Sequence, residues 1–169
     1  MVNTLGIIGG GQLGSMLAVA AKKLNVKTVI FSNDINAPGQ KFANDFIYGE
    51  YNDQVKVDEF VNKVDVVTFE FENIPYETLN KINSFKEVLP KPKINKIIQN
   101  RLSEKDFVNK YNIRTTSYVS VKNENDLISN SNLLPGILKT CTLGYDGKGQ
   151  YTINNINELE KLNIDFTKE

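Results

Sequence analysis

Residues 4–14, TLGIIGGGQLG, lie near the start of this 169-residue chain and decide its fold. Three apolar residues, Leu5, Ile7 and Ile8, run into a glycine cluster, as a buried strand does before a tight turn. From Gln12 the apolar residues take the spacing of a helix with one buried face. The stretch therefore predicts a strand, a glycine turn and a helix. The residues expected on the buried face of that helix are Leu13, Met16, Leu17, Ala20 and Leu24.

Segments rich in Val and Ile alternate with helical patterns over residues 1–100. Strands are expected at residues 27–31, 46–48, 65–69 and 87–89, and helices at residues 54–62 and 76–82. This alternation is typical of βαβ units around a parallel sheet. We therefore expect an α/β fold whose first domain, residues 1–100, is Rossmann-like.

The pattern changes after residue 100. Ser103 and Asp106 have the spacing of a capping box, which is expected to open a helix just after Arg101. Further strands are expected at residues 118–121, 136–139 and 150–153, and further helices at residues 124–130 and 157–162. Such short elements bury too little apolar surface to be stable alone. Residues 101–169 are therefore expected to form an incomplete second domain.

The composition narrows the chemistry. Lys and Arg together number 20, as do Asp and Glu, so the net formal charge is zero and no nucleic-acid partner is expected. The apolar runs are too short to cross a bilayer, so no membrane partner is expected either. Cys141 is the only cysteine, which fits a reducing, cytoplasmic compartment. The absence of histidine excludes Ser-His and Cys-His catalysis and His-ligated zinc, which leaves carboxylates, lysines, arginines and backbone amides.

The first candidate site is the glycine turn. Gly9, Gly11 and Gly14 fit the G-x-G-x-x-G pattern between a strand and a helix, where free N–H groups and the helix dipole favour an anion. A dinucleotide site also needs an acidic residue at the end of the second strand. Here that strand is expected to end at Ser32, and Asp34 comes two residues late. The turn is therefore either a dinucleotide site or a device that lets the helix pack on the sheet.

A second motif, TFEFENIP, occupies residues 68–75 and follows an expected buried strand. Glu70 and Glu72 are two residues apart, so they point to the same side of an extended segment. They follow the carboxyl end of a strand, where open parallel sheets bind ligands. Their carboxylates could accept hydrogen bonds from ribose hydroxyls or an amine, or they could be solvated loop charges.

A third motif, GYDGKGQ, occupies residues 144–150 between two expected strands. Its glycines allow a loop whose amides fold over phosphate oxygens, while Lys148 and the preceding Lys139 would supply positive charge. The motif is not a Walker A loop, because it lacks the G-x-x-x-x-G-K-[ST] pattern and does not lead into a helix. The alternative interpretation is an ordinary exposed hairpin.

In this order and spacing, GIIGGGQLG, TFEFENIP and LKT…GYDGKGQ resemble the N5-carboxyaminoimidazole ribonucleotide synthetases, a family of the ATP-grasp superfamily. Residues 97–107, IIQNRLSEKDF, are similar to the helix before that family's grasp domain. The resemblance implies a Rossmann-like, parallel-sheet pre-ATP-grasp domain followed by the start of an ATP-grasp domain. It also implies that MgATP activates bicarbonate to carboxylate the amine of 5-aminoimidazole ribonucleotide in purine biosynthesis, with ADP and phosphate released.

The resemblance implies two sets of binding residues and identifies no catalytic residue. The residues implied to contact ATP are Arg101, Lys139, Gly144, Tyr145, Asp146, Gly147, Lys148, Gly149 and Gln150. Those implied to line the aminoimidazole ribonucleotide site are Gly11, Gln12, Leu13 and Glu70. A homodimer is also implied, and the ligands of Mg²⁺ are expected beyond Glu169. Cys141 stands where family members commonly carry an arginine.

Three other classes remain open. An NAD-binding Rossmann-type module would give no role to Lys139 or to the second glycine-rich loop. A sibling ATP-grasp enzyme, such as a formate-using glycinamide ribonucleotide transformylase or a biotin carboxylase, is disfavoured by GYDGKGQ and EFEN. A non-catalytic binding or dimerisation module would bind neither nucleotide nor ribonucleotide.

This chain alone is expected not to turn over ATP, because the resemblance places the adenine-clamping residues and the magnesium-binding carboxylates outside it. ADP release is measured with MgATP and bicarbonate, with and without 5-aminoimidazole ribonucleotide. The same sequence extended past Glu169 serves as the comparison. Release by the 169-residue chain that depends on both bicarbonate and the ribonucleotide would contradict the expectation.

Overall fold

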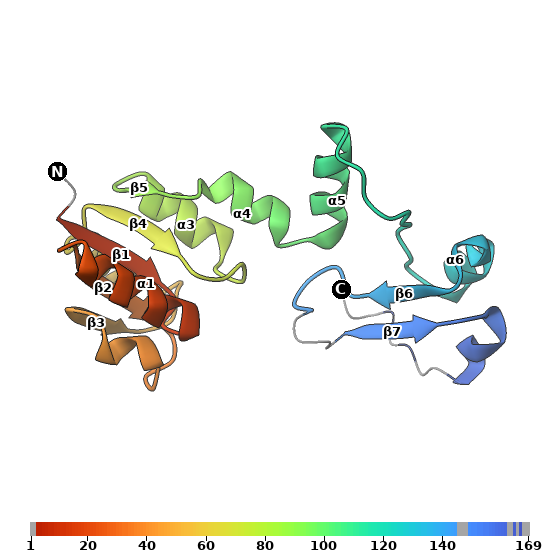
Figure 1. The fold of residues 1–169 in the computed structure, drawn as a ribbon, viewed down its shortest axis with the longest axis horizontal. Coiled ribbons are helices and arrows are strands. Elements are labelled where there is room, and N and C mark those ends of the chain that lie inside the picture. Colours follow the sequence, from red (N-terminus) through yellow and green to blue (C-terminus); the bar gives the residue numbers. More distant parts are fainter. Residues whose placement is uncertain (1–2, 145–148, 162–163, 165, 167–169) are drawn as a thin grey trace. The chain divides into compact units, whose positions relative to one another are not determined.

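An open parallel sheet with helices on both faces forms the first unit, residues 1–96 (Figure 1). The computed structural model describes residues 3–144, 149–161, 164 and 166 of the chain. The strands are β1 (Thr4–Ile8), β2 (Lys27–Ser32), β3 (Asp45–Tyr48), β4 (Val66–Phe69) and β5 (Glu87–Val88). The helices are α1 (Gln12–Lys23), the 3₁₀ helix η1 (Pro38–Lys41), α2 (Gln54–Val61), α3 (Tyr76–Asn83) and α4 (Pro92–Ile98), which ends in the next unit. The expected α/β fold with a parallel sheet is confirmed.

The strand order places the candidate site. All four strand pairings are parallel, and the order is β3-β2-β1-β4-β5. The chain builds outward from β1 in one direction through β3 and then returns to the other side of β1 with β4. In such sheets, ligands bind in the crevice outside the carboxyl ends of the strands where the order reverses. That point lies between β1 and β4, where the glycine turn and the TFEFENIP segment begin.

Two apolar layers hold the sheet between its helices. On one face, α2 and α3 pack Phe60, Leu79 and Ile82, all fully buried, against the sheet. On the other face, Ala18 of α1 packs against Ile7 and Ile30. The aromatic rings of Phe31 and Phe60 lie 5.5 Å apart, centroid to centroid, within the larger layer. Truncation of one such buried ring to alanine typically costs about 3–5 kcal/mol.

The prediction of the buried face of α1 from its apolar spacing is wrong. All five predicted side chains are exposed, from 37% for Leu17 to 76% for Leu24. The residues of α1 that are buried are Gly14, Ala18 and Ala21. Small residues lie there because the helix approaches the sheet and the turn closely: a Cβ on Gly14 would lie 2.5 Å from the carbonyl oxygen of Gly9. Close backbone approach, and not the apolar period, selects the buried face.

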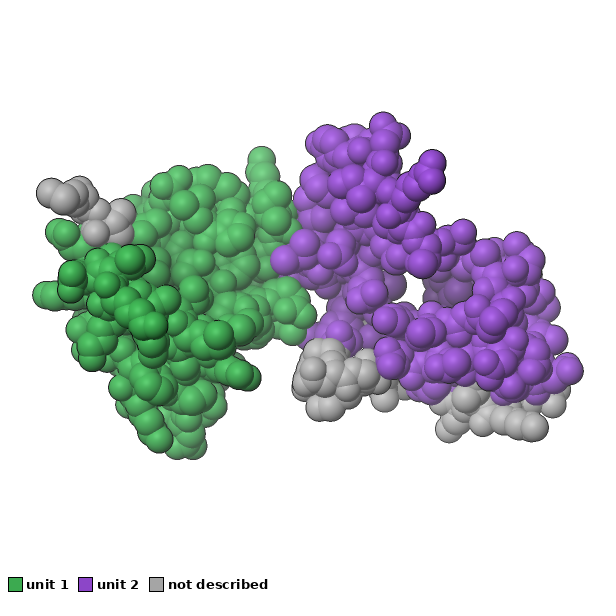
Figure 2. Space-filling model, viewed as in Figure 1, with its two compact units in different colours: residues 1–96 green, residues 97–169 purple. Residues whose placement is uncertain are grey.

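The second unit, residues 97–169 (Figure 2, purple), contains an antiparallel hairpin of two strands, β6 and β7 (Figure 1). Its elements are α5 (Arg101–Lys110), α6 (Glu124–Ser129), the 3₁₀ helix η2 (Ser131–Leu133), β6 (Gly136–Lys139), β7 (Gln150–Ile153) and the 3₁₀ helix η3 (Ile156–Lys161). A small core forms where Leu127 and Ile153 are buried against Leu138 and Tyr151. The final helix, predicted at residues 157–162, is the 3₁₀ helix η3 over its described part.

Two further expectations for this unit are wrong. Residues 118–121 do not form a strand. The sheet of this unit contains only β6 and β7 among the described residues, and Tyr118 contacts α5 instead. The hydroxyl of Tyr118 donates a hydrogen bond of 2.6 Å to Asp106 Oδ1. The cap of α5 is Asn100 and not Ser103: Asn100 Oδ1 accepts hydrogen bonds from the N–H groups of Leu102 and Ser103. Among the described residues, no helix is long and apolar enough to span a membrane.

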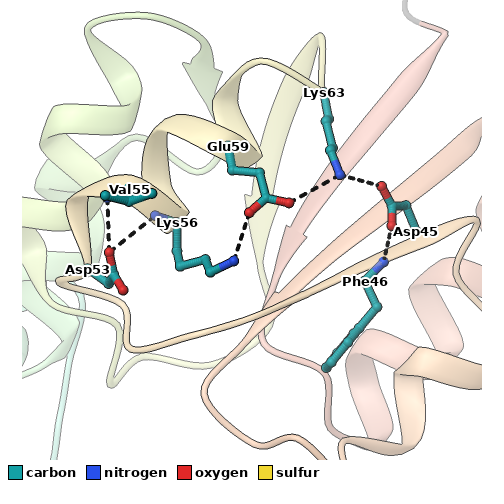
Figure 3. Close-up of polar contacts among 7 residues, drawn as sticks. All are labelled: Asp45, Phe46, Asp53, Val55, Lys56, Glu59 and Lys63. Carbon is teal, nitrogen blue, oxygen red and sulfur yellow. Dashed lines mark hydrogen bonds and ion pairs between the residues drawn. The ribbon is translucent and has the colours of Figure 1, made fainter.

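A chain of ion pairs joins α2 to the edge strand β3 (Figure 3). Lys63 Nζ lies 2.8 Å from Asp45 Oδ2 and 3.3 Å from Glu59 Oε1, and Lys56 Nζ lies 2.9 Å from Glu59 Oε2. The hydrogen bond from Lys63 is the main reason that the pKa of Asp45 lies below its usual value. These charges also protect the outer edge of the sheet, because charged side chains on an edge strand discourage pairing with another chain.

Asp45→Asn is expected to lower the free energy of unfolding at pH 7 by roughly 0.2–1 kcal/mol, the usual worth of an exposed ion pair. The pKa of Asp45 is lower in the folded state, so this contribution is full above the unfolded pKa. It is lost as the pH falls through the lower, folded pKa. Urea denaturation at pH 7 and at about pH 2.5 compares the variant with the wild type. If the free energies of unfolding of the variant and the wild type differ equally at both pH values, the assigned ion pair of Asp45 is contradicted.

Candidate functional site

The glycine turn after β1 is shaped by backbone contacts on two sides. Gly9 has a φ of +100°, a conformation that side-chain-bearing residues rarely adopt, and its N–H donates to the carbonyl of Phe31 at 2.8 Å. The carbonyl of Gly10 accepts a 2.8 Å hydrogen bond from the N–H of Gly39. A Cβ on Gly10 would lie 2.7 Å from that of Ala37, so η1 and the residue before it cover one side of the turn.

The other side of the turn is occupied by the carboxylate of Glu70, the first residue after β4. Its Oε1 accepts the N–H of Gly11 at 2.9 Å, and its Oε2 accepts the N–H of Gly14 at 2.7 Å. Gly11 is the N-cap of α1 and supplies no side-chain cap, so Glu70 satisfies the start of the helix from a distant part of the chain. A carboxylate here is also favoured by the positive end of the helix dipole.

This contact argues against a dinucleotide site. The pyrophosphate of a dinucleotide would need the same helix start that Glu70 already fills, and its charge would be repelled by the carboxylate. The last residue of β2 is Ser32, which is 3% exposed and cannot replace the acidic residue that holds a ribose in dinucleotide folds. The glycine turn is therefore a closed helix start with a protein carboxylate inside it.

The four residues predicted for the ribonucleotide site lie at this turn. Gly11 and Glu70 are in direct contact, and Gln12 and Leu13 form the exposed first turn of α1. The segment that follows Glu70 is fastened by Asn95 of α4, whose Nδ2 donates to the carbonyls of Glu72 and Ile74 at 3.1 and 3.2 Å. Asn95 is fully buried, and within the described residues its Oδ1 has no hydrogen-bond partner.

The hairpin of the second unit brings part of the predicted ATP set together. Lys139 of β6 lies directly opposite Gln150 of β7, and both side chains are exposed. Ile137, two residues before Lys139 and opposite Thr152, is on the same face and 57% exposed. The other face packs into the small core of this unit. The exposed face therefore combines a cation, an amide and an apolar side chain.

The ends of the hairpin loop are fixed by backbone contacts. The N–H of Thr140 donates to the carbonyl of Gly149 at 2.9 Å, and the N–H of Arg101 donates to the carbonyl of Cys141 at 2.9 Å. The start of α5 is thus joined to the chain two residues after Lys139. Gly144 is exposed at the first end of the loop. The predicted ATP contacts at Tyr145, Asp146, Gly147 and Lys148 lie outside the described residues.

Sequence reasoning missed two residues at these sites. Tyr51, which lies between β3 and α2, is 7% exposed and packs beside the segment that follows Glu70. No motif contains it, because its contacts come from parts of the chain far apart in sequence. Ile137 could have been predicted, because residues two apart on a strand share a face and Lys139 was already a predicted site residue.

No metal centre is built from the described residues: they contain no group of three or more His, Cys, Asp or Glu side chains that could hold an ion. The carboxylate of Glu70 at the glycine turn accepts hydrogen bonds from two backbone amides.

Comparison with known families defines the class. Residues 2–99 match the ribonucleotide synthetase pre-ATP-grasp domain, and residues 106–169 match the ATP-grasp domain. A pre-ATP-grasp sheet followed by ATP-grasp residues is the organisation of a class of ATP-dependent ligases. The open sheet and the hairpin are the corresponding parts of this chain.

Individual relatives define the family. The N5-carboxyaminoimidazole ribonucleotide synthase of Brucella melitensis is 40% identical over 163 residues, which cover 95% of this chain and 45% of that protein. The Staphylococcus epidermidis synthase is 36% identical over 94% of this chain and 43% of its own length. The crystal structure of the Staphylococcus aureus synthetase complexed with ADP is 35% identical, with a TM-score of 0.88 over 94% of this chain and 43% of that one. The chain belongs to the N5-carboxyaminoimidazole ribonucleotide synthase family and spans less than half the length of these relatives.

Glu70→Ala is expected to lower the free energy of unfolding by about 1–3 kcal/mol, because the N–H groups of Gly11 and Gly14 lose a charged acceptor at a helix start. Glu50→Ala, at an exposed glutamate after β3, is the matched control and is expected to change it by less than about 0.5 kcal/mol. Urea denaturation measures both. Equal losses in the two variants would contradict the assigned role of Glu70.

Proposed function

We propose that this chain provides the ribonucleotide-binding domain and part of the ATP site of an enzyme that carboxylates 5-aminoimidazole ribonucleotide. The reaction uses ATP and bicarbonate and gives N5-carboxyaminoimidazole ribonucleotide, ADP and phosphate, a step of purine biosynthesis. The family match over both units is the observation that carries the proposal. We assign residues 1–100 to the first of these functions and residues 101–169 to the second.

The ribonucleotide site is proposed at Gly11, Gln12, Leu13 and Glu70. Each oxygen of Glu70 accepts one backbone N–H and keeps capacity for a second hydrogen bond. A ribose hydroxyl or an amine is a donor and suits that remaining capacity, whereas a phosphate is an acceptor and does not. The turn is therefore proposed to recognise the sugar or the amine of the substrate and not its phosphate.

The nucleotide site is proposed along the exposed face of the hairpin. Lys139 would neutralise phosphate oxygens, Gln150 would hydrogen-bond beside it, and Ile137 would offer an apolar contact to a base. Arg101, Gly144 and Gly149 complete the described part of the set. Phosphoryl transfer depends on positioning and charge neutralisation, which these residue types supply without histidine. Tyr145, Asp146, Gly147 and Lys148 are included on the strength of the motif alone.

Other features of the proposed enzyme rest on the family. Mg²⁺ is proposed to act with ATP, held by carboxylates outside the described residues. A homodimer is proposed, and light scattering of the purified chain measures it. The cytoplasmic location predicted from the single cysteine stays a prediction.

Lys139→Ala is expected to weaken ADP binding about tenfold, because a charge-assisted contact to phosphate is removed. Lys110→Ala, at the exposed end of α5, is the matched control and is expected to leave the affinity unchanged. Titration of the ¹⁵N-labelled chain, followed by NMR, measures both dissociation constants. Absence of ADP binding to the wild type, or equal weakening in both variants, would contradict the proposed nucleotide site.

A further inference from the structure

Tyr51 lies in the segment between β3 and α2, near the carboxyl edge of the sheet and outside every motif. It follows β3 by three residues and is 7% exposed. Its own carbonyl accepts a 2.9 Å hydrogen bond from the hydroxyl of the buried Thr78, so the backbone is fastened to α3. This side chain is held at a fixed position next to the candidate site.

The ring of Tyr51 connects the sheet to the segment that carries Glu70. It packs edge-on against Phe31 of β2, with ring centroids 5.4 Å apart and an interplanar angle of 82°. It also packs against Phe71, with centroids 6.2 Å apart. Phe71 is the residue directly after Glu70, so the ring supports the backbone from which the Glu70 carboxylate reaches the turn.

Polar groups at the end of β2 and after β4 lie near the phenol of Tyr51. Burial raises the pKa of Tyr51 above its usual value, the neighbouring Asn33 N–H and Ser32 hydroxyl act in the opposite direction, and the charge of Glu70 adds to the increase. Ser32 in turn backs the glycine turn, since a Cβ on Gly10 would lie 3.3 Å from that of Ser32. Tyr51 thus connects the segment after β3 to the carboxyl end of β2 and to the segment after β4.

We propose that Tyr51 is a positioning residue of the ribonucleotide site: its ring holds Phe71, and through Phe71 it fixes the Glu70 carboxylate against Gly11 and Gly14. The ring carries this role, and the hydroxyl is secondary. The identity of the ligand, 5-aminoimidazole ribonucleotide, rests on the proposed function. The role of Tyr51 in placing Glu70 is independent of that function.

The test compares Tyr51→Leu, which removes the ring, with the conservative Tyr51→Phe, which keeps it. Tyr48→Leu, at a 48% exposed tyrosine on β3, is the matched control. The first measurement is the ¹⁵N–¹H signals of Gly11 and Gly14, which report their hydrogen bonds to Glu70 and do not respond to a uniform loss of stability. The second is the affinity for 5-aminoimidazole ribonucleotide.

The Gly11 and Gly14 amide signals are expected to move in Tyr51→Leu and to stay in place in Tyr51→Phe and Tyr48→Leu. The ribonucleotide affinity is expected to fall about tenfold in Tyr51→Leu and to be retained in Tyr51→Phe. Unmoved amide signals in a folded Tyr51→Leu protein overturn the inference. If that variant does not fold, Phe71→Leu replaces it, with the same expected and overturning results.

A wild type that does not bind the ribonucleotide contradicts the proposed function and leaves the amide comparison to decide the role of Tyr51. Movement of the two amide signals then still supports positioning of Glu70, and its absence still overturns it.

Discussion

The hydrogen bonds from the Gly11 and Gly14 amides to the Glu70 carboxylate are the contact on which the rest of the site depends. They join the end of β4 to the start of α1 across the point where the strand order reverses. The contact brings a side chain next to the turn, where residues at Gly9 and Gly14 larger than glycine would collide with Glu70 or with the backbone. It also gives the start of the helix a carboxylate partner. A pattern that elsewhere binds pyrophosphate is thereby converted into a rigid support for a carboxylate.

The close approach of α1 to the glycine turn also determines how the first unit packs. Because the start of α1 is drawn onto the turn, the helix meets the sheet through Gly14, Ala18 and Ala21, and its larger apolar residues remain on the outer surface. The opposite face of the sheet has no such constraint and is filled by large side chains such as Phe60 and Leu79. The second unit packs differently. One face of its hairpin contributes to a small core, and Lys139 and Gln150 lie on the other face.

Much of the fold could be predicted from the sequence, because strand and turn signals are local. The strands near residues 4–8, 27–32 and 66–69, the glycine turn between them and the later hairpin all follow from alternation, β-branched residues and glycines. The failures are contacts between distant parts of the chain. Nothing near Met16 shows that α1 buries its small side, and nothing near Ser103 shows that Asn100, three residues earlier, caps α5.

The candidate site was predictable to the same extent. The motifs predicted which residues belong to the turn and the hairpin, and the misplaced Asp34 already weakened the dinucleotide interpretation. That Glu70 fills the helix start, and that Tyr51 supports it through Phe71, could not be predicted, because both depend on the sheet bringing separate loops to one edge. The assignment of individual residues to ligands remains a proposal in both units.

The glycine turn is proposed to recognise a ribonucleotide and not a dinucleotide. Chemical-shift mapping of the ¹⁵N-labelled chain distinguishes the two, with 5-aminoimidazole ribonucleotide and NAD added in separate titrations. We expect the ribonucleotide to move the amide signals of Gly11, Gln12 and Leu13 and NAD to leave them unchanged. Movement of these signals by NAD, with none by the ribonucleotide, would contradict this proposal.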